Sequence, residues 1–206
     1  QVLREQLTML YIQRGYVSSG AIIPDQDIVD GIVTFQIVEG KLNEIDIQGL
    51  KYFERDYLAD RLAGGDNEVL HVPSLEERMQ ILLQDPLVRR LNVDLGPGLR
   101  PGESRLQVRV EEGNQVNLDT LIANDRSPSI GTNHGAFRVT ARNLTGHADP
   151  LYLELNRTLG AYDATLDYNV PFTPDDTRAH FRVSYYNSSV IDPTFEALDI
   201  GSVQVR

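Results

Sequence analysis

The hydrophobic pattern of this chain changes once, close to residue 113, and this change limits the folds that are open to it. Before residue 113, segments with apolar residues at helical spacing are mixed with short segments in which apolar and polar residues alternate. After it, the helical spacing disappears, and alternating segments remain that are separated by turn-forming residues. We therefore expect an α+β part that is followed by an antiparallel all-β part.

The α+β part repeats one order of elements. Apolar residues recur at helical spacing from Val2 to Arg14, and two strand-like segments follow, the second from Ile32 to Val38. The same order then returns in a fuller form, with a strand, two helices and two more strands. The pattern therefore predicts an incomplete unit at residues 1–41 and a complete unit, of order β-α-α-β-β, at residues 42–113.

The complete unit contains a helix start signal. Ser74-Leu75-Glu76-Glu77 has the sequence of a capping box, in which the serine and the third residue after it satisfy each other's backbone amides. The second helix is therefore predicted to begin at Ser74, and the first helix is predicted from Glu54 to Leu62. A segment rich in glycine and proline separates the last two strands. The strands are predicted at residues 44–48, 91–95 and 106–110.

The all-β part consists of alternating segments of about 10 residues, with one apolar and one polar face. Strands of this kind, joined by short and long connections, are typical of the wall of an outer-membrane β-barrel. A soluble antiparallel sheet that packs one face on a core has the same alternation, so the pattern alone leaves both structures open. The predicted strands are residues 115–123, 135–143, 150–158, 161–170 and 178–188.

Charge and composition exclude several classes of function. The chain has 19 Lys and Arg against 30 Asp and Glu, a net charge of −11, so we expect no basic surface for nucleic acid. The absence of cysteine excludes a disulfide framework, a thiolate metal site and a cysteine nucleophile. No apolar run in the sequence is long enough for a membrane-spanning helix.

The sequence also lacks the common catalytic and metal-binding patterns. Its 4 histidines are scattered, and none lies one helical turn from another. There is no G-x-S-x-G nucleophile motif and no phosphate-binding loop, and nothing in the pattern brings His71 and Ser74 together. We therefore expect no catalytic, metal-binding or cofactor-binding residues, and a protein that is not an enzyme.

A binding function remains. A small β-α-α-β-β unit has a short sheet that helices cover on one side, so the edges of the sheet are exposed. Such edges accept an extended chain as an additional strand. Two of these units in tandem, joined to a sheet-forming region, suggest a protein that handles extended polypeptide, whereas the plainer alternative is that they are spacer domains.

Short motifs follow one another along nearly the whole chain. They are Gly15-Tyr16-Val17-Ser18-Ser19, Pro24, Asp30-Gly31-Ile32-Val33, Val38-Glu39-Gly40-Lys41-Leu42, Leu95-Gly96-Pro97-Gly98, Pro101-Gly102-Glu103-Ser104, Val108-Arg109-Val110-Glu111-Glu112, Asn124-Asp125-Arg126-Ser127, Gly131 and Asn143 to Leu151. In this order they resemble two-partner secretion transporters of the outer membrane, of the hemolysin/hemagglutinin secretion-activation type, in which POTRA domains precede a β-barrel. Asp125, Ser127-Pro128 and Ala148 depart from the usual motifs and put local turn shapes in question.

The resemblance implies a domain organisation and a function. Residues 1–41 would be the end of a first POTRA domain, residues 42–113 a second POTRA domain, and residues 114–206 the first strands of an incomplete transmembrane β-barrel. The chain would then be an N-terminal fragment of a transporter in a bacterial-type outer membrane, with its POTRA domains in the periplasm. It would recognise a secreted partner protein as extended polypeptide and export it through its barrel, without a nucleotide or cofactor.

The resemblance also implies contacts for each part. Outer-membrane lipid would surround the barrel of the full-length protein, and the open sheet edges of the fragment would pair with each other or with another copy. In the POTRA order the fourth element lies at the sheet edge, which makes it the expected partner-binding strand. Its residues are Arg90, Leu91, Asn92, Val93 and Asp94. Leu58 and Leu62 on the neighbouring helix are expected either to line a groove beside this strand or to be buried in the core of the domain.

Two other functions stay open at this point. One is an assembly or insertion factor for outer-membrane proteins, from the same superfamily, which the number of POTRA domains in the full-length protein would distinguish. The other is a soluble surface-binding or adhesin domain, which would not fractionate with the outer membrane.

Overall fold

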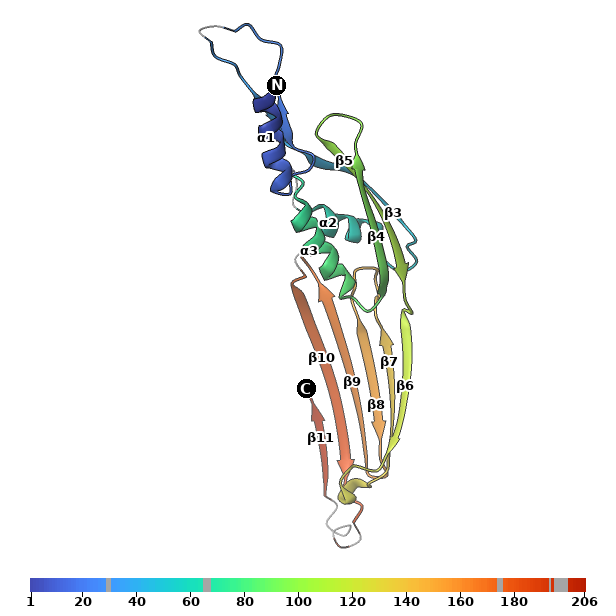
Figure 1. Cartoon of the computed structure of the whole chain (residues 1–206). Helices are drawn as coiled ribbons and strands as arrows, with labels where there is room; N and C mark the ends of the chain where they lie inside the picture. Colours follow the sequence, from blue (N-terminus) through green and yellow to red (C-terminus); the bar gives the residue numbers. More distant parts are fainter. Residues whose placement is uncertain (29–30, 65–67, 174–175, 193, 195–199) are drawn as a thin grey trace. The chain divides into compact units, whose positions relative to one another are not determined.

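The computed structural model describes residues 1–28, 31–64, 68–173, 176–192, 194 and 200–206 (Figure 1). Asp30, which belongs to one of the quoted motifs, lies outside these residues. The chain divides into two compact units, Gln1–Gly113 and Asn114–Arg206. Within the described residues, the first unit contains three α-helices and two small sheets, and the second contains one large antiparallel sheet. The expected change from an α+β part to an all-β part is therefore confirmed.

The first unit begins with a helix and a strand pair. Helix α1 (Val2–Gln13) is followed by β1 (Gly20–Ile22) and β2 (Gln36–Val38), which pair in antiparallel fashion. The Thr8 hydroxyl on α1 accepts a hydrogen bond of 3.1 Å from the backbone N–H of Ala21, which fixes the helix against β1. The strand predicted from Ile32 to Val38 forms only over its last residues, because β1 is short and pairs with no more of it.

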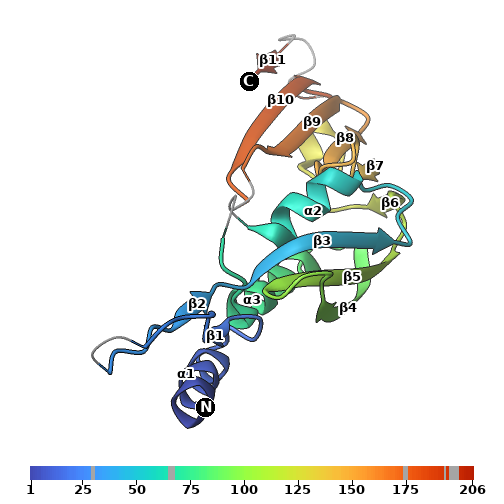
Figure 2. The same ribbon diagram turned by 90° about the horizontal axis from the view of Figure 1, so that it is seen from above.

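A three-stranded sheet follows, with β3 (Lys41–Gln48), β4 (Val88–Pro97) and β5 (Glu103–Glu112) in the order β3-β5-β4. The central strand β5 is parallel to β3 and antiparallel to β4. Helices α2 (Arg55–Ala63) and α3 (Val72–Leu83) lie on one side of this sheet (Figure 2). Between helices and sheet lies a core whose most buried side chains are Leu58, Leu62, Leu87, Leu106 and Val108.

Helix α3 begins two residues earlier than predicted, so the capping-box prediction at Ser74 is wrong. The N-cap is His71, and Pro73 occupies the first turn, a position that proline tolerates well. The Ser74 hydroxyl and Nδ1 of His71 are 2.8 Å apart, and Nε2 of His71 is 3.1 Å from the backbone carbonyl oxygen of Arg14. His71 therefore joins the start of α3 to the end of α1, a contact that sequence spacing did not reveal.

Replacing His71 with alanine is expected to lower the free energy of unfolding of the first unit by about 1–2 kcal/mol, because both of these hydrogen bonds are lost. Urea denaturation of the full chain, followed by circular dichroism at helical wavelengths, measures the loss. The Ser74→Ala variant removes only one of the two bonds and should lose less stability. Wild-type stability of the His71 variant would show that the contact contributes nothing.

The second unit is a six-stranded antiparallel sheet in which every strand pairs with its neighbours in sequence. The first five strands agree with the predicted segments to within a few residues. The sixth, β11, was not predicted, because its alternation is too short to stand out from a turn. The strands are β6 (Val116–Ala123), β7 (His134–Ala141), β8 (Leu151–Arg157), β9 (Ala161–Pro171), β10 (Arg178–Ser189) and β11 (Gly201–Val205).

One face of this sheet is apolar and exposed. The register places Leu153, Leu166 and Val183 in one cross-strand row, and Phe137 and Leu155 in another on the same face. Phe137 is 39% exposed, and Val183 is 58% exposed. A soluble sheet would bury such a row against a core, whereas none of the described residues of this unit covers it. The exposed apolar face favours the barrel wall over the soluble sheet.

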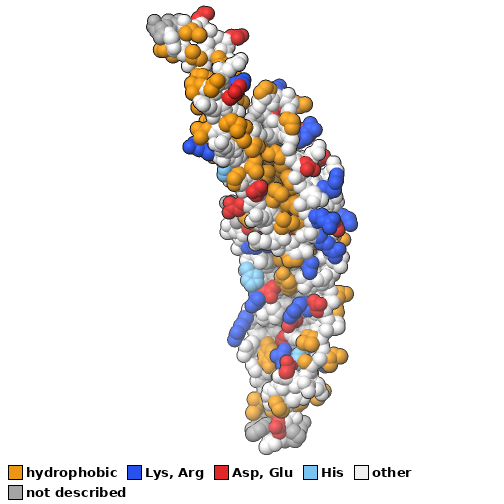
Figure 3. Space-filling model, viewed as in Figure 1, with side chains coloured by type: hydrophobic (Ala, Val, Ile, Leu, Met, Phe, Trp, Pro, Cys, Tyr) orange, Lys and Arg blue, Asp and Glu red, His pale blue; other side chains and the backbone are white. Residues whose placement is uncertain are grey.

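The other face is polar, and several of its charged side chains form ion pairs. Arg138 forms an ion pair with Glu154, and Asp167 contacts both His180, at 2.8 Å, and Arg182, at 2.6 Å. Figure 3 shows acidic and basic side chains next to one another over the strands of this unit. Among the described residues of the chain, no helix is long and apolar enough to cross a membrane.

Candidate polypeptide-binding edge

The predicted partner-binding residues lie in the middle of β4, at one edge of the three-stranded sheet. Strand β4 pairs with β5 alone, with Leu91 opposite Val110 and Val93 opposite Val108. Its other side has no partner strand within the described part of the chain. The N–H and C=O groups on that side are therefore available to an added strand.

Side chains along β4 alternate between two environments. Leu91 and Val93 are half-buried on the side of the helices, whereas Arg90, Asn92 and Asp94 are exposed on the opposite face. Helix α3, which packs on β4, leaves apolar side chains exposed near its end, Ile81 at 42% and Leu83 at 45%. An extended chain added to β4 would gain backbone hydrogen bonds and, at alternate positions, apolar contacts.

The opposite edge of the sheet, strand β3, is partly closed. Lys41 forms a β-bridge with Val69, and the Arg55 guanidinium donates a hydrogen bond of 3.1 Å to the backbone carbonyl of Ile45. The register of β3 also shifts at Asn43, which leaves a bulge in the strand. Strand β4 is therefore the more accessible edge for strand addition.

Leu58 and Leu62 do not line a groove beside β4. Both are 1% exposed and belong to the core between α2 and the sheet. The groove expectation is wrong, and the alternative, burial in the domain's own core, is what the structure shows. Apolar side chains that lie about one helical turn apart mark the inner face of a helix, and this spacing agrees with the burial of both residues.

Charges beside the edge are weakly paired. Nη1 of Arg90 lies 3.5 Å from a carboxylate oxygen of Glu111, and both side chains are more than half exposed. An exposed pair of this kind contributes at most about 1 kcal/mol, so an incoming chain can displace it at low cost. Arg90 and Asp94 place one positive and one negative charge along the edge, so the edge does not favour a bound chain of one particular charge.

Glu112, a buried carboxylate at the end of β5 that the sequence analysis did not single out, binds the loop that follows β3. Glu112 is 7% exposed, and its carboxylate accepts hydrogen bonds from the backbone N–H of Lys51, at 2.9 Å, and of Tyr52, at 2.8 Å. The signal was present in the alternation of β5, because Glu112 falls at an inward position in phase with Val110. Glu112 holds the connection between β3 and α2, next to the sheet that carries the candidate binding edge.

The motif from Asn143 to Leu151 forms a compact turn in the second unit. Asp149 is fully buried and accepts hydrogen bonds from the Tyr168 hydroxyl, at 2.6 Å, and from the Thr145 backbone N–H, at 2.9 Å. The Asn143 side chain accepts a hydrogen bond of 3.1 Å from the backbone N–H of Ala148, which has a left-handed φ of 55°. The motif therefore joins the β7–β8 turn to β9 and carries structure rather than chemistry.

Comparison with known proteins supports this reading of both units. Residues 1–40 match the POTRA domain of the ShlB type. The outer membrane transporter CdiB of Dickeya dadantii is 26% identical over 152 residues, which cover 73% of this chain and 26% of that protein. The heme/hemopexin transporter protein HuxB of Haemophilus influenzae is 22% identical over 188 residues, covering 89% of this chain and 33% of HuxB. The chain thus spans about a quarter to a third of the length of these curated relatives.

Solved structures agree on the fold. CdiB from Escherichia coli superposes with a TM-score of 0.63 at 22% identity, over 93% of this chain and 37% of that one. BamA from Haemophilus ducreyi lacking POTRA domains 1–3 gives a TM-score of 0.65 at 15% identity, over 95% and 38%. At these identities the structural likeness bears on the fold alone. Sequence and fold therefore agree with the resemblance: the chain is similar to outer membrane transporters such as CdiB in sequence and to CdiB from Escherichia coli in fold.

Proposed function

We propose that the protein to which this chain belongs recognises a secreted partner protein in the periplasm and exports it across the outer membrane. The observation that carries this proposal is the open edge of β4, which is available over a strand of 10 residues, while the β3 edge is partly closed. The named relatives, CdiB and HuxB, are transporters, and the similarity to them supports the same role here.

The two units would act in sequence. The β4 edge would take up an extended segment of the partner by strand addition, a mode in which backbone hydrogen bonds provide affinity and alternate side chains provide specificity. The sheet of the second unit would form part of the barrel wall, with its apolar face towards outer-membrane lipid and its paired charges towards the interior. Nothing in this scheme requires a catalytic residue, a nucleotide or a cofactor.

The open strand edges of the second unit predict that the isolated chain self-associates. Strands β6 and β11 each have one partner strand among the described residues. Open edges of this kind pair readily with another chain, so we expect the isolated chain to self-associate. Size-exclusion chromatography at several protein concentrations would detect this association.

A secretion experiment in the host tests the proposed function. Deleting the gene should remove at least one large protein from the culture medium, and the full-length wild-type protein should restore it. An Asn92→Pro variant should fail to restore it, with secretion reduced at least about tenfold, because proline interrupts the backbone hydrogen bonding of β4. Quantitative mass spectrometry of the medium measures secretion.

Asn43→Pro is the matched control. It makes the same substitution on the opposite edge strand, at a bulge, where proline is tolerated. Both variants must reach the outer membrane at wild-type levels, which immunoblotting of membrane fractions checks. Equal secretion by the two variants would contradict binding at the β4 edge. If deletion lowers outer-membrane proteins in general and removes no secreted protein, the assembly function is the correct one.

A further inference from the structure

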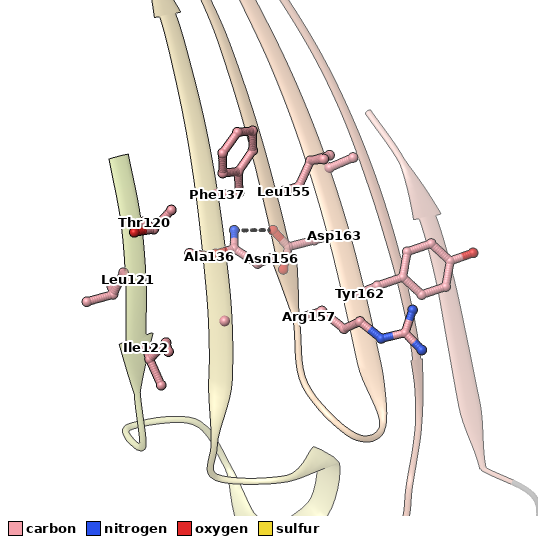
Figure 4. Close-up of a pocket in the computed structure, with 12 residues that line it drawn as sticks. Thr120, Leu121, Ile122, Ala136, Phe137, Leu155, Asn156, Arg157, Tyr162 and Asp163 are labelled. Atoms are coloured by element: carbon pink, nitrogen blue, oxygen red, sulfur yellow. Dashed lines mark hydrogen bonds between the residues drawn. The ribbon is translucent and has the colours of Figure 1, made fainter. Parts of the chain in front are cut away.

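The apolar face of the second unit contains a cavity of about 550 Å³ near the β8–β9 turn. The register explains where its walls come from. One cross-strand row holds Phe137, Leu155 and Ala164, and the next row towards the turn holds Arg157 and Tyr162. Figure 4 shows Phe137 and Leu155 next to one another, with Arg157 and Tyr162 nearer the turn.

The cavity exists because a glycine stands in the second row. Gly135 lies between Ile122 and Arg157 across the strands, where any other residue would place a side chain. A Cβ atom built on Gly135 has no neighbour within 4 Å, and its φ is not in the left-handed region. Backbone strain therefore does not require glycine here, and the space it leaves is open.

The two ends of the cavity differ in chemistry. At the turn, the exposed Arg157 guanidinium has no hydrogen-bond or ion-pair partner among the described residues, and the Tyr162 hydroxyl lies 3.2 Å from that of Tyr185. Towards the strand centres, the walls are Phe137 and Leu155, which are 39% and 43% exposed. The lining also includes Asn156 and Asp163, which are joined by a hydrogen bond of 2.7 Å and whose side chains alternate to the opposite side of the sheet from Arg157 and Tyr162. On the side of Arg157, a cation and a hydroxyl at one end and hydrocarbon at the other match an anionic amphiphile.

We propose that this cavity binds a phosphate-bearing lipid, with the phosphate on Arg157 and the Tyr162 hydroxyl and the acyl chain in the space that Gly135 leaves beside Phe137 and Leu155. A guanidinium donates paired hydrogen bonds to phosphate oxygens, and a tyrosine at the boundary between apolar and polar surroundings is well placed to donate another. The volume lies within the usual range of ligand pockets. The site is confined to the second unit, so it is independent of partner recognition at β4.

Calorimetric titration of the full chain with lauroyl lysophosphatidic acid, below its micelle concentration, tests the proposal. Lauroyl glycerol supplies the chain without the phosphate, and inorganic phosphate supplies the anion without the chain. We expect lysophosphatidic acid to bind at least about tenfold more tightly than lauroyl glycerol, and phosphate not to displace it, since a charged hydrogen bond to phosphate is worth about a factor of ten or more.

Variants assign the effect to the cavity. Arg157→Gln should weaken lysophosphatidic acid about tenfold and leave lauroyl glycerol unchanged, and Tyr162→Phe should cause a smaller loss while keeping the ring. Gly135→Val should weaken both lipids, because it fills the space. Arg4→Gln, which makes the same charge change in the first unit, should have no effect.

Several results would overturn the proposal. They are wild-type binding of lysophosphatidic acid by the Arg157 variant, equal binding of the two lipids, and displacement of lysophosphatidic acid by inorganic phosphate. A fourth is a Gly135 variant that changes the oligomeric state of the chain but not its lipid binding. That result would show that a second copy, rather than a lipid, occupies the cavity.

Discussion

Replacing Glu112 with glutamine is expected to lower the free energy of unfolding of the first unit by about 2–3 kcal/mol. The buried carboxylate accepts hydrogen bonds from the backbone N–H groups of Lys51 and Tyr52, at 2.9 and 2.8 Å. Hydrogen bonds to a charged acceptor are stronger than those to a neutral one. In glutamine, an NH₂ group replaces one of the two carboxylate oxygens and would face a backbone N–H. That backbone N–H would then be buried without a hydrogen-bond acceptor.

The neighbouring residue provides the control for this prediction. Glu111 is the next residue on β5, but its side chain is 56% exposed and its contact with Arg90 is 3.5 Å long. Glu111→Gln should therefore change stability by less than about 0.5 kcal/mol. Hydrogen exchange of β5 amides in the full chain, measured by mass spectrometry, reports on this unit separately from the other. Equal exchange rates in the two variants would show that Glu112 does not hold the loop.

Replacing Asp149 with alanine should destabilise the second unit by about 3 kcal/mol, because the Tyr168 hydroxyl and the Thr145 N–H both lose a buried acceptor. Hydrogen exchange in β8 and β9 measures the loss. Tyr168→Phe removes the hydroxyl donor but leaves the Thr145 N–H bonded to Asp149. It should therefore lower the free energy of unfolding by about half as much. If the two variants are equally stable, the turn is not held through Asp149.

The same carboxyl gives the second unit a dependence on pH. Burial by itself would raise the pKa of Asp149, but hydrogen bonds from Tyr168 and Thr145 outweigh it and hold the pKa below its usual range. Because the folded pKa lies below that of the unfolded chain, the stabilisation is present above about pH 4 and is lost as the pH falls towards the folded pKa. Asp149→Asn does not titrate, so its stability should change less than that of the wild type between about pH 5 and pH 3. An identical acid dependence would contradict this.

Sequence periodicity anticipates those parts of this fold that depend on nearest neighbours. The alternation of β8 to β10 predicts both the strands and their faces, because side chains in a strand alternate whatever the sheet around them does. The placement of Arg90 to Asp94 at an edge follows from the POTRA order, and the structure puts these residues there. Whether a partner binds them is what the Asn92→Pro experiment decides.

Features that depend on distant contacts could not be predicted. The start of α3 was assigned to Ser74 because local spacing fits a capping box, but His71 takes that position with help from a carbonyl of Arg14, far away in the sequence. The alternation of β5 places Glu112 on the inward side, but the backbone N–H groups of Lys51 and Tyr52, which make a buried carboxylate favourable there, come from a distant part of the chain. In each case the deciding partner comes from another element of the fold.

The neighbour-to-neighbour order of the second sheet has a consequence for how this unit folds. Every pair of neighbouring strands from β6 to β11 is also consecutive in the chain. Forming such a pair therefore requires closure of only the loop that connects its two strands. Chain entropy therefore opposes each step by a modest amount, and long-range contacts are not needed before the next hairpin can form. The sheet can therefore grow one strand at a time from any of its hairpins, and each strand already in place sets the register of the next one.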